Sequence, residues 1–348
     1  MRKGLVIGKF WPPHNGHLQL IDHLERECDK VYVVVCAAPG QIPSGERRAV
    51  WLQSIVPSAE VIVVDDFCAS HHPEPCPHEC SALWARRVER LGIGPISVVA
   101  TGETYGPLFA SELKAQHLEV KREPETGLSS TAIRRDLSGN WIRIPRPVRE
   151  GLFRKLVVLG AESTGTSTLA FDLARRLSAP IASEAGRTMS WALFAHSDSM
   201  ESIEWTVEHF WRIIDAQIAL EHLAIGAVVD DPPSDIGPWL VCDTDLLATV
   251  AWWERYLPIP SDAVRQFADT RLADLYVVTS PSGINFDDSD PLRDGRLVRA
   301  HMHERFLELV GASGRPWIEV SGSRVERVEQ VLQAIREHEI QNPRWVHH

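Results

Sequence analysis

The sequence lacks any apolar run long enough to cross a lipid bilayer, and no apolar leader precedes its first expected strand. It also lacks a basic excess: 36 Lys and Arg against 47 Asp and Glu give a formal net charge of −11, which argues against a nucleic-acid partner. Its 6 cysteines follow no disulfide framework, as is typical of a reducing compartment. We therefore expect a cytoplasmic protein with no membrane or nucleic-acid partner. The sequence leaves open whether the protein forms a homo-oligomer.

What the sequence does contain is a repeated alternation of short apolar runs and amphipathic stretches, the pattern of a parallel α/β fold. In the first half, the expected strands are residues 5–7, 31–36, 61–64 and 96–100, and the expected helices are residues 18–27, 46–54 and 82–91. A proline-rich stretch, residues 140–149, then interrupts the pattern, and we expect no regular element there.

The pattern restarts after this interruption. Strands are expected at residues 155–159, 239–242, 275–278 and 317–320, with a closing helix at 324–339 and a loose tail beyond it. A chain of 348 residues is long enough for two domains of ordinary size. We predict a Rossmann-like domain at residues 1–148 and a P-loop α/β domain at residues 149–340.

The most informative stretch is residues 8–17, Gly-Lys-Phe-Trp-Pro-Pro-His-Asn-Gly-His, between an apolar run and an amphipathic run. His14 and His17 flank Gly16 at the expected helix start, so both imidazoles share a face beside backbone N–H groups that favour anions. Lys9 adds a positive charge from the strand side. A histidine pair alone is weak evidence, but in this context it predicts a site for a triphosphate attacked at its α-phosphorus.

A second polar motif, Gly-Leu-Ser-Ser-Thr-Ala-Ile-Arg, occupies residues 127–134. Ser129, Ser130 and Thr131 are suited to cap a helix and to offer hydroxyl and N–H groups to phosphate oxygens. Arg134 returns to the same helical face, where its guanidinium fits the same phosphates. A capped surface helix is the alternative interpretation of this motif on its own.

The second half opens with a phosphate loop that departs from the usual pattern. Residues 160–168, Gly-Ala-Glu-Ser-Thr-Gly-Thr-Ser-Thr, follow a strand and precede a helix, as a P-loop does. Thr166 stands where the pattern has lysine, so the charge that bridges β- and γ-phosphates is missing, while Ser167 remains available for Mg²⁺. The predicted nucleotide contacts are Gly160, Ser163, Gly165, Thr166, Ser167 and Thr168.

Charged residues further along have kinase character. Glu184 and Arg187 follow the next apolar segment, and Asp243 and Asp245 end a hydrophobic strand, where a carboxylate can hold Mg²⁺ or accept a proton. A polar loop at residues 290–296 is a candidate lid. The predicted kinase-like site comprises Glu184, Arg187, Asp243, Asp245, Arg293 and Arg296, with Arg299 beyond the lid.

The first two motifs resemble the H-x-G-H and I-S-S-T-x-I-R signatures of the nucleotidyltransferase superfamily. Taken in order with the phosphate loop, they resemble the bifunctional NadR-type enzymes of NAD salvage over residues 3–335, without a helix-turn-helix segment ahead of them. The resemblance implies a nicotinamide mononucleotide adenylyltransferase followed by a ribosylnicotinamide kinase-like domain, using ATP with Mg²⁺ and, in the kinase reaction, nicotinamide riboside. It implies catalytic roles for His14, His17, Lys9 and Arg134, nucleotide contacts from Gly8, Phe10, Gly16, Ser129, Ser130 and Thr131, and substrate contacts from Trp11 and Arg47.

Several alternatives stay open. Trp11 either stacks on a substrate ring or packs within its loop, and either Arg47 or Arg48 faces the substrate. Because of Thr166, the second domain is either a weak kinase or a non-catalytic nucleotide sensor that regulates the first. Another small-substrate nucleotidyltransferase, acting on pantetheine phosphate or glycerol phosphate, is a further alternative.

One cluster of thiols and imidazoles has no support from this resemblance. Within thirteen residues lie Cys68, His71, His72, Cys76, His78 and Cys80. Such a density of ligands suits zinc, but the spacing fits no regular C-x-x-C pair. We expect a proline-rich surface loop and no resident metal.

Overall fold

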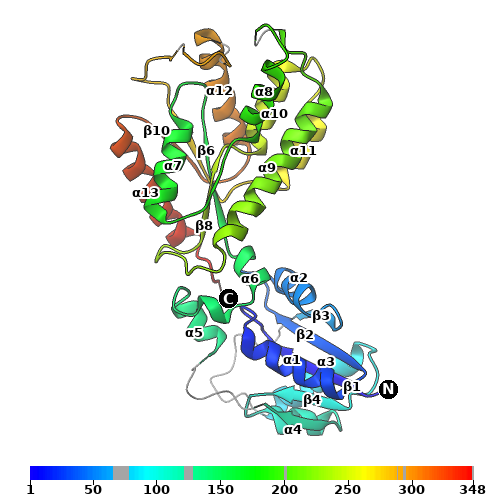
Figure 1. Ribbon diagram of the computed structural model, residues 1–348. Coiled ribbons are helices and arrows are strands. Elements are labelled where there is room, and N and C mark those ends of the chain that lie inside the picture. Colours follow the sequence, from blue (N-terminus) through cyan, green and yellow to red (C-terminus); the bar gives the residue numbers. More distant parts are fainter. Residues whose placement is uncertain (66–77, 121–127, 200–201, 288, 293–294, 347–348) are drawn as a thin grey trace. The chain divides into compact units, whose positions relative to one another are not determined.

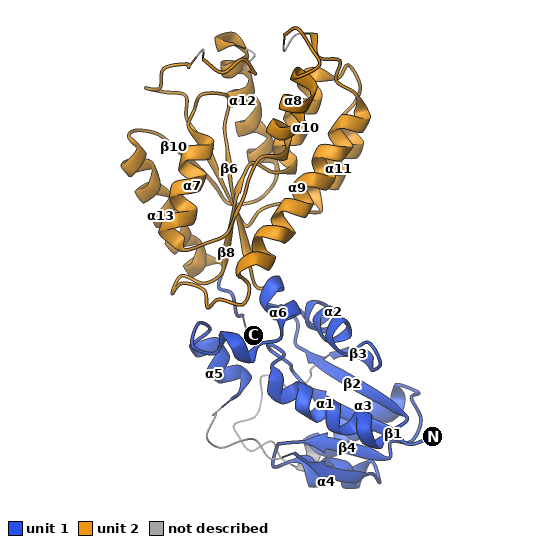
Figure 2. Cartoon of the chain, viewed as in Figure 1, with its two compact units in different colours: residues 1–151, 343–348 blue, residues 152–342 orange. Residues whose placement is uncertain are grey.

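The chain forms two compact units, each built on a parallel sheet. The structure, a computed structural model, describes residues 1–65, 78–120, 128–199, 202–287, 289–292 and 295–346 (Figure 1). Unit 1 comprises Met1–Gly151 with Pro343–His348, and unit 2 comprises Leu152–Asn342 (Figure 2). The sequence-based division at residue 148 lies three residues before this boundary, and the chain also returns to unit 1 after unit 2. No helix among the described residues combines the length and apolarity needed to span a membrane.

Unit 1 contains a five-stranded sheet in the order β3-β2-β1-β4-β5, with every neighbouring pair parallel. Its strands are β1 (Lys3–Gly8), β2 (Lys30–Ala37), β3 (Glu60–Asp65), β4 (Val98–Thr101) and β5 (Gln116–Glu119). Its helices are α1 (Asn15–Glu27), α2 (Gly45–Ile55), α3 (His78–Arg90), α4 (Gly106–Glu112), α5 (Ser130–Arg135), the 3₁₀ turn η1 (Trp141–Arg143) and α6 (Arg146–Gly151).

The alternation of side chains along β1 explains why both faces of this sheet are covered. Leu5 packs on the side of α3 and α4, whereas Val6 packs on the side of α1 and α2, and both side chains are buried. The strand order reverses between β1 and β4, which is the switch point where doubly wound sheets bind ligands. The motif of residues 8–17 follows β1 and therefore starts at this point.

Residues 140–149 correct the sequence-based expectation of an irregular break. They contain η1 and most of α6. Pro147 is the second residue of α6, and a proline there costs little because first-turn N–H groups have no intrahelical acceptor.

Unit 2 repeats the architecture with the strand order β10-β9-β6-β8-β7, again parallel throughout. Its strands are β6 (Arg154–Leu159), β7 (Ile181–Ala182), β8 (Trp239–Asp243), β9 (Leu275–Thr279) and β10 (Trp317–Val320). Its helices are α7 (Thr166–Leu177), α8 (Ala185–Phe194), α9 (Val207–Val228), α10 (Leu246–Tyr256), α11 (Asp262–Asp269), α12 (Arg296–Ala312) and α13 (Arg324–Gln341).

Helices cover both faces of the second sheet (Figure 1), and an apolar layer lies between the sheet and the helices on each face. Val158 faces the layer formed with α7 and α13, and Val157 faces the layer formed with α9, α10 and α12. The central strand β6 leads directly into the phosphate loop. The two-domain α/β prediction is confirmed, and the loops that follow β1 and β6 hold the candidate sites.

The tail is not loose, as the sequence suggested, but pairs with unit 1. Ile42 and Val346 form an antiparallel bridge with reciprocal backbone hydrogen bonds of 3.0 and 3.2 Å. The indole of Trp345 meets that of Trp11 edge to face, with ring centroids 6.4 Å apart. Residues 343–346 are therefore part of unit 1.

Candidate functional site: a histidine turn and a phosphate loop

The two histidines of the first motif stack on each other at the start of α1. Their ring centroids lie 3.7 Å apart, and His14 is the N-cap residue. The backbone N–H of His14 donates to Nδ1 of His17 over 3.2 Å. Because this nitrogen accepts a hydrogen bond, a neutral His17 imidazole carries its proton on Nε2 and is a donor there. Such a donor suits a phosphate oxygen.

Two neighbours fix this histidine pair. A Cβ atom on Gly16 would lie 3.1 Å from the His14 ring, so glycine allows the imidazole to fold over the helix start. Phe10, buried and with a φ of 49°, places its ring 4.8 Å from that of His17. The predicted nucleotide-contact residues Phe10 and Gly16 thus shape the turn that holds the imidazoles, and Gly8 ends β1 immediately before it.

The second motif docks directly on the first, more than 110 residues away in sequence. Ser130 Oγ donates to the Pro12 carbonyl over 3.0 Å, and Arg134 Nη1 donates to the Trp11 carbonyl over 2.6 Å. Arg134 Nη2 also reaches Thr131 Oγ1 at 3.0 Å. Ser130 and Arg134, predicted as phosphate ligands, therefore also hold the two motifs together, while the Thr131 hydroxyl orients Arg134.

Ser129 has a local role in the same motif. Its side chain caps α5 by accepting a hydrogen bond from the Ala132 N–H over 3.0 Å. This contact confirms the predicted helix cap, and it fixes the turn from which Thr131 and Arg134 project.

Arg134 is a partly desolvated cation at this junction. Burial lowers its pKa, and the charge of neighbouring Arg135 lowers it further. An anion such as a phosphate would offset both effects. The guanidinium also lies 4.1 Å from the centroid of the Trp11 ring, and Trp11 is only 5% exposed. The indole is thus packed within its loop, the second of the two alternatives for this residue.

The structure turns Arg48, not the predicted Arg47, toward the first motif. Arg48 is 0% exposed and donates to the Lys9 carbonyl, to the Cys36 carbonyl at 3.3 Å and to Gln41 Oε1 at 2.6 Å. Arg47 is exposed, and its guanidinium contacts the Gly151 carbonyl at 3.3 Å. Of the two arginines that the sequence left open, Arg48 is therefore the one that faces the first motif, where it holds the backbone that presents Lys9.

We expect Arg48→Met to destabilise unit 1 by about 3 kcal/mol, because the substitution leaves several buried carbonyl acceptors without a charged donor. Arg47→Met is the matched control and should change stability by about 0.5 kcal/mol or less, as surface substitutions do. Differential scanning calorimetry of the two variants provides the comparison. Equal transition temperatures for both would contradict the assignment of Arg48 as a structural anchor.

The phosphate loop of unit 2 has the backbone form expected from its sequence. A Cβ atom on Gly160 would lie 2.0 Å from Thr279 Oγ1, and Gly165 has a φ of 83°, so both positions need glycine. The buried Thr164 hydroxyl donates to the Ala161 carbonyl over 2.6 Å. Arg327, which belongs to none of the sequence motifs, donates to the Thr164 carbonyl over 2.6 Å and secures the loop from α13.

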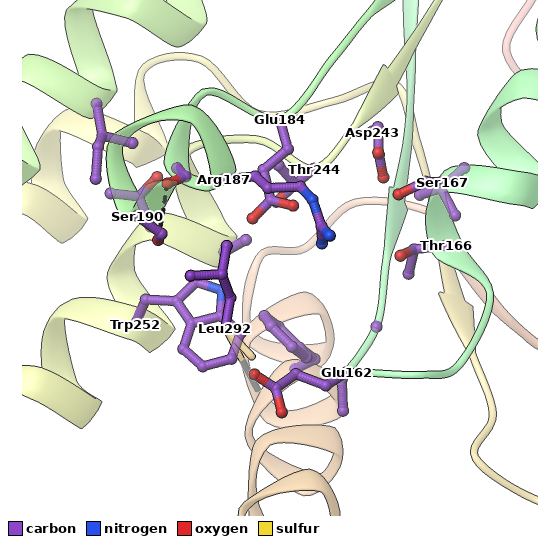
Figure 3. Close-up of a pocket in the computed structure, with 18 of the residues that line it drawn as sticks. Glu162, Thr166, Ser167, Glu184, Arg187, Ser190, Asp243, Thr244, Trp252 and Leu292 are labelled. Atoms are coloured by element: carbon purple, nitrogen blue, oxygen red, sulfur yellow. Dashed lines mark hydrogen bonds between the residues drawn. The ribbon is translucent and has the colours of Figure 1, made fainter. Parts of the chain in front are cut away.

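A cavity of about 460 Å³ opens above this loop. Figure 3 shows Asp243 beside Ser167, with Glu184 and Arg187 projecting toward them from the start of α8. Asp243 is hydrogen-bonded to Ser167, and burial raises its pKa. All the predicted loop contacts line the cavity, namely Gly160, Ser163, Gly165, Thr166, Ser167 and Thr168. A hydroxyl next to carboxylates is a donor set that suits Mg²⁺ accompanied by nucleotide phosphates.

Asp245, predicted as part of the kinase-like site, is not among the residues that line this cavity. It is 1% exposed, and its carboxylate accepts hydrogen bonds of 2.9 Å from the Tyr276 hydroxyl and from the Leu247 N–H. Lys155 Nζ lies 3.7 Å away. As the N-cap of α10, Asp245 therefore stabilises the fold instead of facing a ligand.

The predicted lid arginines also differ from expectation. Arg296 is exposed at the start of α12 and is absent from the cavity lining, while Arg293 lies outside the described residues. Arg299 is buried and donates to the Ser163 carbonyl over 3.3 Å, so it supports the loop. Arg187, paired with Asp290, is the predicted cation that lines the cavity.

Glu184 gives this cavity a pH dependence. Burial and the nearby charge of Asp243 raise its pKa from an ordinary 4.5 to about 7. Folding therefore favours the protonated carboxyl, and stability falls as pH rises from about 4.5 to about 7. We expect Glu184→Gln to be near neutral at pH 5 and stabilising at pH 8, as measured by calorimetry of the unit 2 transition. The exposed Glu329→Gln is the control, and an equal effect of Glu184→Gln at both pH values would contradict the assignment.

The thiol and imidazole cluster falls mostly outside the described residues, which include the backbone of His78 but not Cys68, His71, His72 or Cys76. Cys80 is described and is buried on α3.

Comparison with known proteins finds a match for each of the two units. A cytidylyltransferase-like family model matches residues 5–136, and an AAA domain model matches residues 155–327. The trifunctional NAD biosynthesis/regulator protein NadR of Salmonella typhimurium is 25% identical over 294 residues, which cover 79% of this chain and 68% of that protein. NadR of Escherichia coli is 27% identical over 53% of this chain and 48% of its own length.

Two further relatives extend the comparison. The nicotinamide-nucleotide adenylyltransferase of Caldivirga maquilingensis is 30% identical over 137 residues, which cover 36% of this chain and 68% of that protein. A NadR protein solved in complex with NR has the same fold, with a TM-score of 0.67 at 21% identity over 97% of this chain and 96% of that one.

Fold, motifs and matches define a two-unit protein: a nucleotidyltransferase of the cytidylyltransferase-like class, followed by a kinase-like P-loop unit. The first unit belongs to the nicotinamide-nucleotide adenylyltransferases, and the chain as a whole is homologous to NadR over most of its length.

Proposed function

We propose that unit 1 transfers the adenylyl group of ATP to nicotinamide mononucleotide, giving NAD and pyrophosphate. The observation that carries the proposal is the docking of the second motif on the first, because it brings Arg134 to the loop that holds the histidine pair. The names of the NadR and adenylyltransferase relatives support the choice of substrate.

In the proposed reaction, a phosphate oxygen of nicotinamide mononucleotide attacks the α-phosphorus of ATP in line. A new P–O bond forms while the bond to the bridging oxygen of the leaving pyrophosphate breaks. No covalent enzyme intermediate is needed, so the protein contributes positioning and charge stabilisation. His17, with its Nε2 proton, and His14 contact the α- and β-phosphate oxygens, while Lys9 and Arg134 neutralise the remaining charge.

We propose Mg²⁺ as the divalent ion that accompanies ATP. When bound, the ion neutralises phosphate charge. In unit 2, Ser167 and Asp243 are the residues suited to hold it, because their side chains already meet beside the phosphate loop.

For unit 2 we propose nucleotide binding with little phosphoryl transfer to nicotinamide riboside. Thr166 favours this choice: it lines the cavity at the position of the P-loop lysine, while the backbone of the loop and Ser167 are retained. A nucleotide-sensing role, in which this unit sets the activity of unit 1, is the second candidate function.

The test supplies purified protein with ATP and Mg²⁺, adding nicotinamide mononucleotide, nicotinic acid mononucleotide or nicotinamide riboside in separate reactions, with the products identified by mass. We expect a dinucleotide and pyrophosphate from a mononucleotide and little mononucleotide from the riboside. If neither mononucleotide yields a dinucleotide, the proposed function of unit 1 is wrong.

A further inference from the structure

We propose that residues 343–346 are a positioning element of the adenylyltransferase centre, with Trp345 as a positioning residue for Arg134. The proposal rests on the proposed function of unit 1, because it assigns to Arg134 a role in adenylyl transfer. The family matches end at residues 136 and 327, so neither of them includes this segment.

The segment is attached to the loop that contains Ile42. The Ile42 N–H donates to the Val346 carbonyl over 3.0 Å, and the Val346 N–H donates back to the Ile42 carbonyl over 3.2 Å. The same Ile42 carbonyl accepts a 2.6 Å hydrogen bond from Nε1 of Trp11. One carbonyl therefore joins the segment to the first motif.

Trp345 and Arg134 both contact Trp11. Trp345 meets the indole of Trp11 edge to face, at an interplanar angle of 87°. Arg134 lies 4.1 Å from the centroid of the same ring and donates to the Trp11 carbonyl. Since Trp11 contacts both residues, its orientation links Trp345 to the guanidinium of Arg134.

The residue next to Ile42 connects the same loop to the other cation. Gln41 Oε1 accepts a 2.6 Å hydrogen bond from Arg48, which also donates to the Lys9 carbonyl. The loop that the segment pairs with is thus joined to the Lys9 backbone through Arg48, and to the Arg134 guanidinium through Trp11. Misplacing a catalytic group by about 1 Å costs up to about 10²-fold in rate, so loosening this support should be visible in kcat.

The test uses the full chain and a double-mutant cycle for NAD formation. We expect Trp345→Ala to lower kcat about tenfold, Arg134→Ala to lower it about 10²-fold or more, and the double variant to be no slower than Arg134→Ala alone. Trp345→Phe should recover most of the activity. Trp317→Ala, a half-exposed tryptophan of unit 2, is the matched control and should leave adenylyl transfer unchanged.

A backbone variant tests the segment without removing an indole. Val346→Pro deletes the N–H that donates to Ile42, whereas Val346→Ala keeps it, so the proline variant should lose several-fold more activity. The far-ultraviolet circular dichroism spectrum should be the same in all variants and reports on correct folding.

Each failure has a distinct meaning. If Arg134→Ala is strongly impaired while Trp345→Ala and Val346→Pro keep full kcat, the positioning role is wrong and the proposed function stands. If the loss of kcat in the double variant equals the product of the losses in Trp345→Ala and Arg134→Ala, the segment does not act through Arg134, and the proposal is also wrong. If the native chain forms no NAD, the proposed function itself fails.

Discussion

We expect His17→Ala to lower the kcat of adenylyl transfer by about 10²- to 10³-fold, with a much smaller change in KM, because it removes one preorganised donor to the charge that develops on the phosphates. The structure supports this size of effect. The imidazole is held between Phe10 and His14, and Nδ1 already accepts the His14 N–H, which fixes Nε2 as the donor.

The control for this substitution is His23→Ala on the same helix. His23 is exposed and bonds to the Gln19 carbonyl at 2.7 Å, so its loss should leave kcat within about twofold, as for a surface substitution. Steady-state kinetics with nicotinamide mononucleotide and ATP distinguishes the two variants. Full turnover by His17→Ala would overturn the assignment of the histidine pair to the reaction.

Thr166→Lys should have the second large effect, raising phosphorylation of nicotinamide riboside by about 10²-fold or more from a feeble native rate. Thr166 is the first residue of α7 and lines the cavity, so a lysine there adds its charge beside Ser167 and Asp243 (Figure 3). A positive charge that bridges the β- and γ-phosphates stabilises the transition state of γ-phosphoryl transfer more than it stabilises bound ATP. Thr166→Lys should therefore raise kcat without raising the affinity for ATP.

Thr168→Lys is the matched control, since it adds the same charge two residues further along α7 and should not restore turnover. The assay measures riboside phosphorylation at saturating ATP with Mg²⁺. If the native chain already reaches an ordinary kinase rate and Thr166→Lys adds nothing, the weak-kinase hypothesis is wrong. Arg187 would then be the substitute cation to test, because it lines the cavity while Arg299 is engaged with the Ser163 carbonyl.

The features that the sequence predicts well are those encoded by local pattern. Strands such as β1, β2 and β6 contain continuous apolar runs, and the glycine-containing turns after β1 and β6 each lead into a helix, so the two α/β units and their order follow from sequence. β5 was not predicted, because Gln116–Glu119 contains a single aliphatic residue and pairs only at the edge of its sheet.

Contacts between distant residues explain the remaining differences. No local pattern shows that Val346 pairs with Ile42, or that Arg327 reaches the carbonyl of Thr164. Arg48 did carry a signal, because it shares a helical face with the buried Trp51 and Leu52. Its charge nevertheless suggested a ligand contact, whereas its partners are carbonyl groups of the protein.

The return of residues 343–346 to unit 1 makes unit 2 an inserted domain, bounded on both sides by the same fold. Its two ends lie together, since Arg154 near the entry donates to the Asn342 carbonyl at the exit over 2.5 Å and pairs with Glu339 at 2.7 Å. Domains with adjacent ends tolerate insertion and excision. A gene that joined codon 151 to codon 343 through a short linker would thus encode an uninterrupted nucleotidyltransferase with its final segment retained, whereas truncation after residue 151 would remove that segment together with the inserted domain.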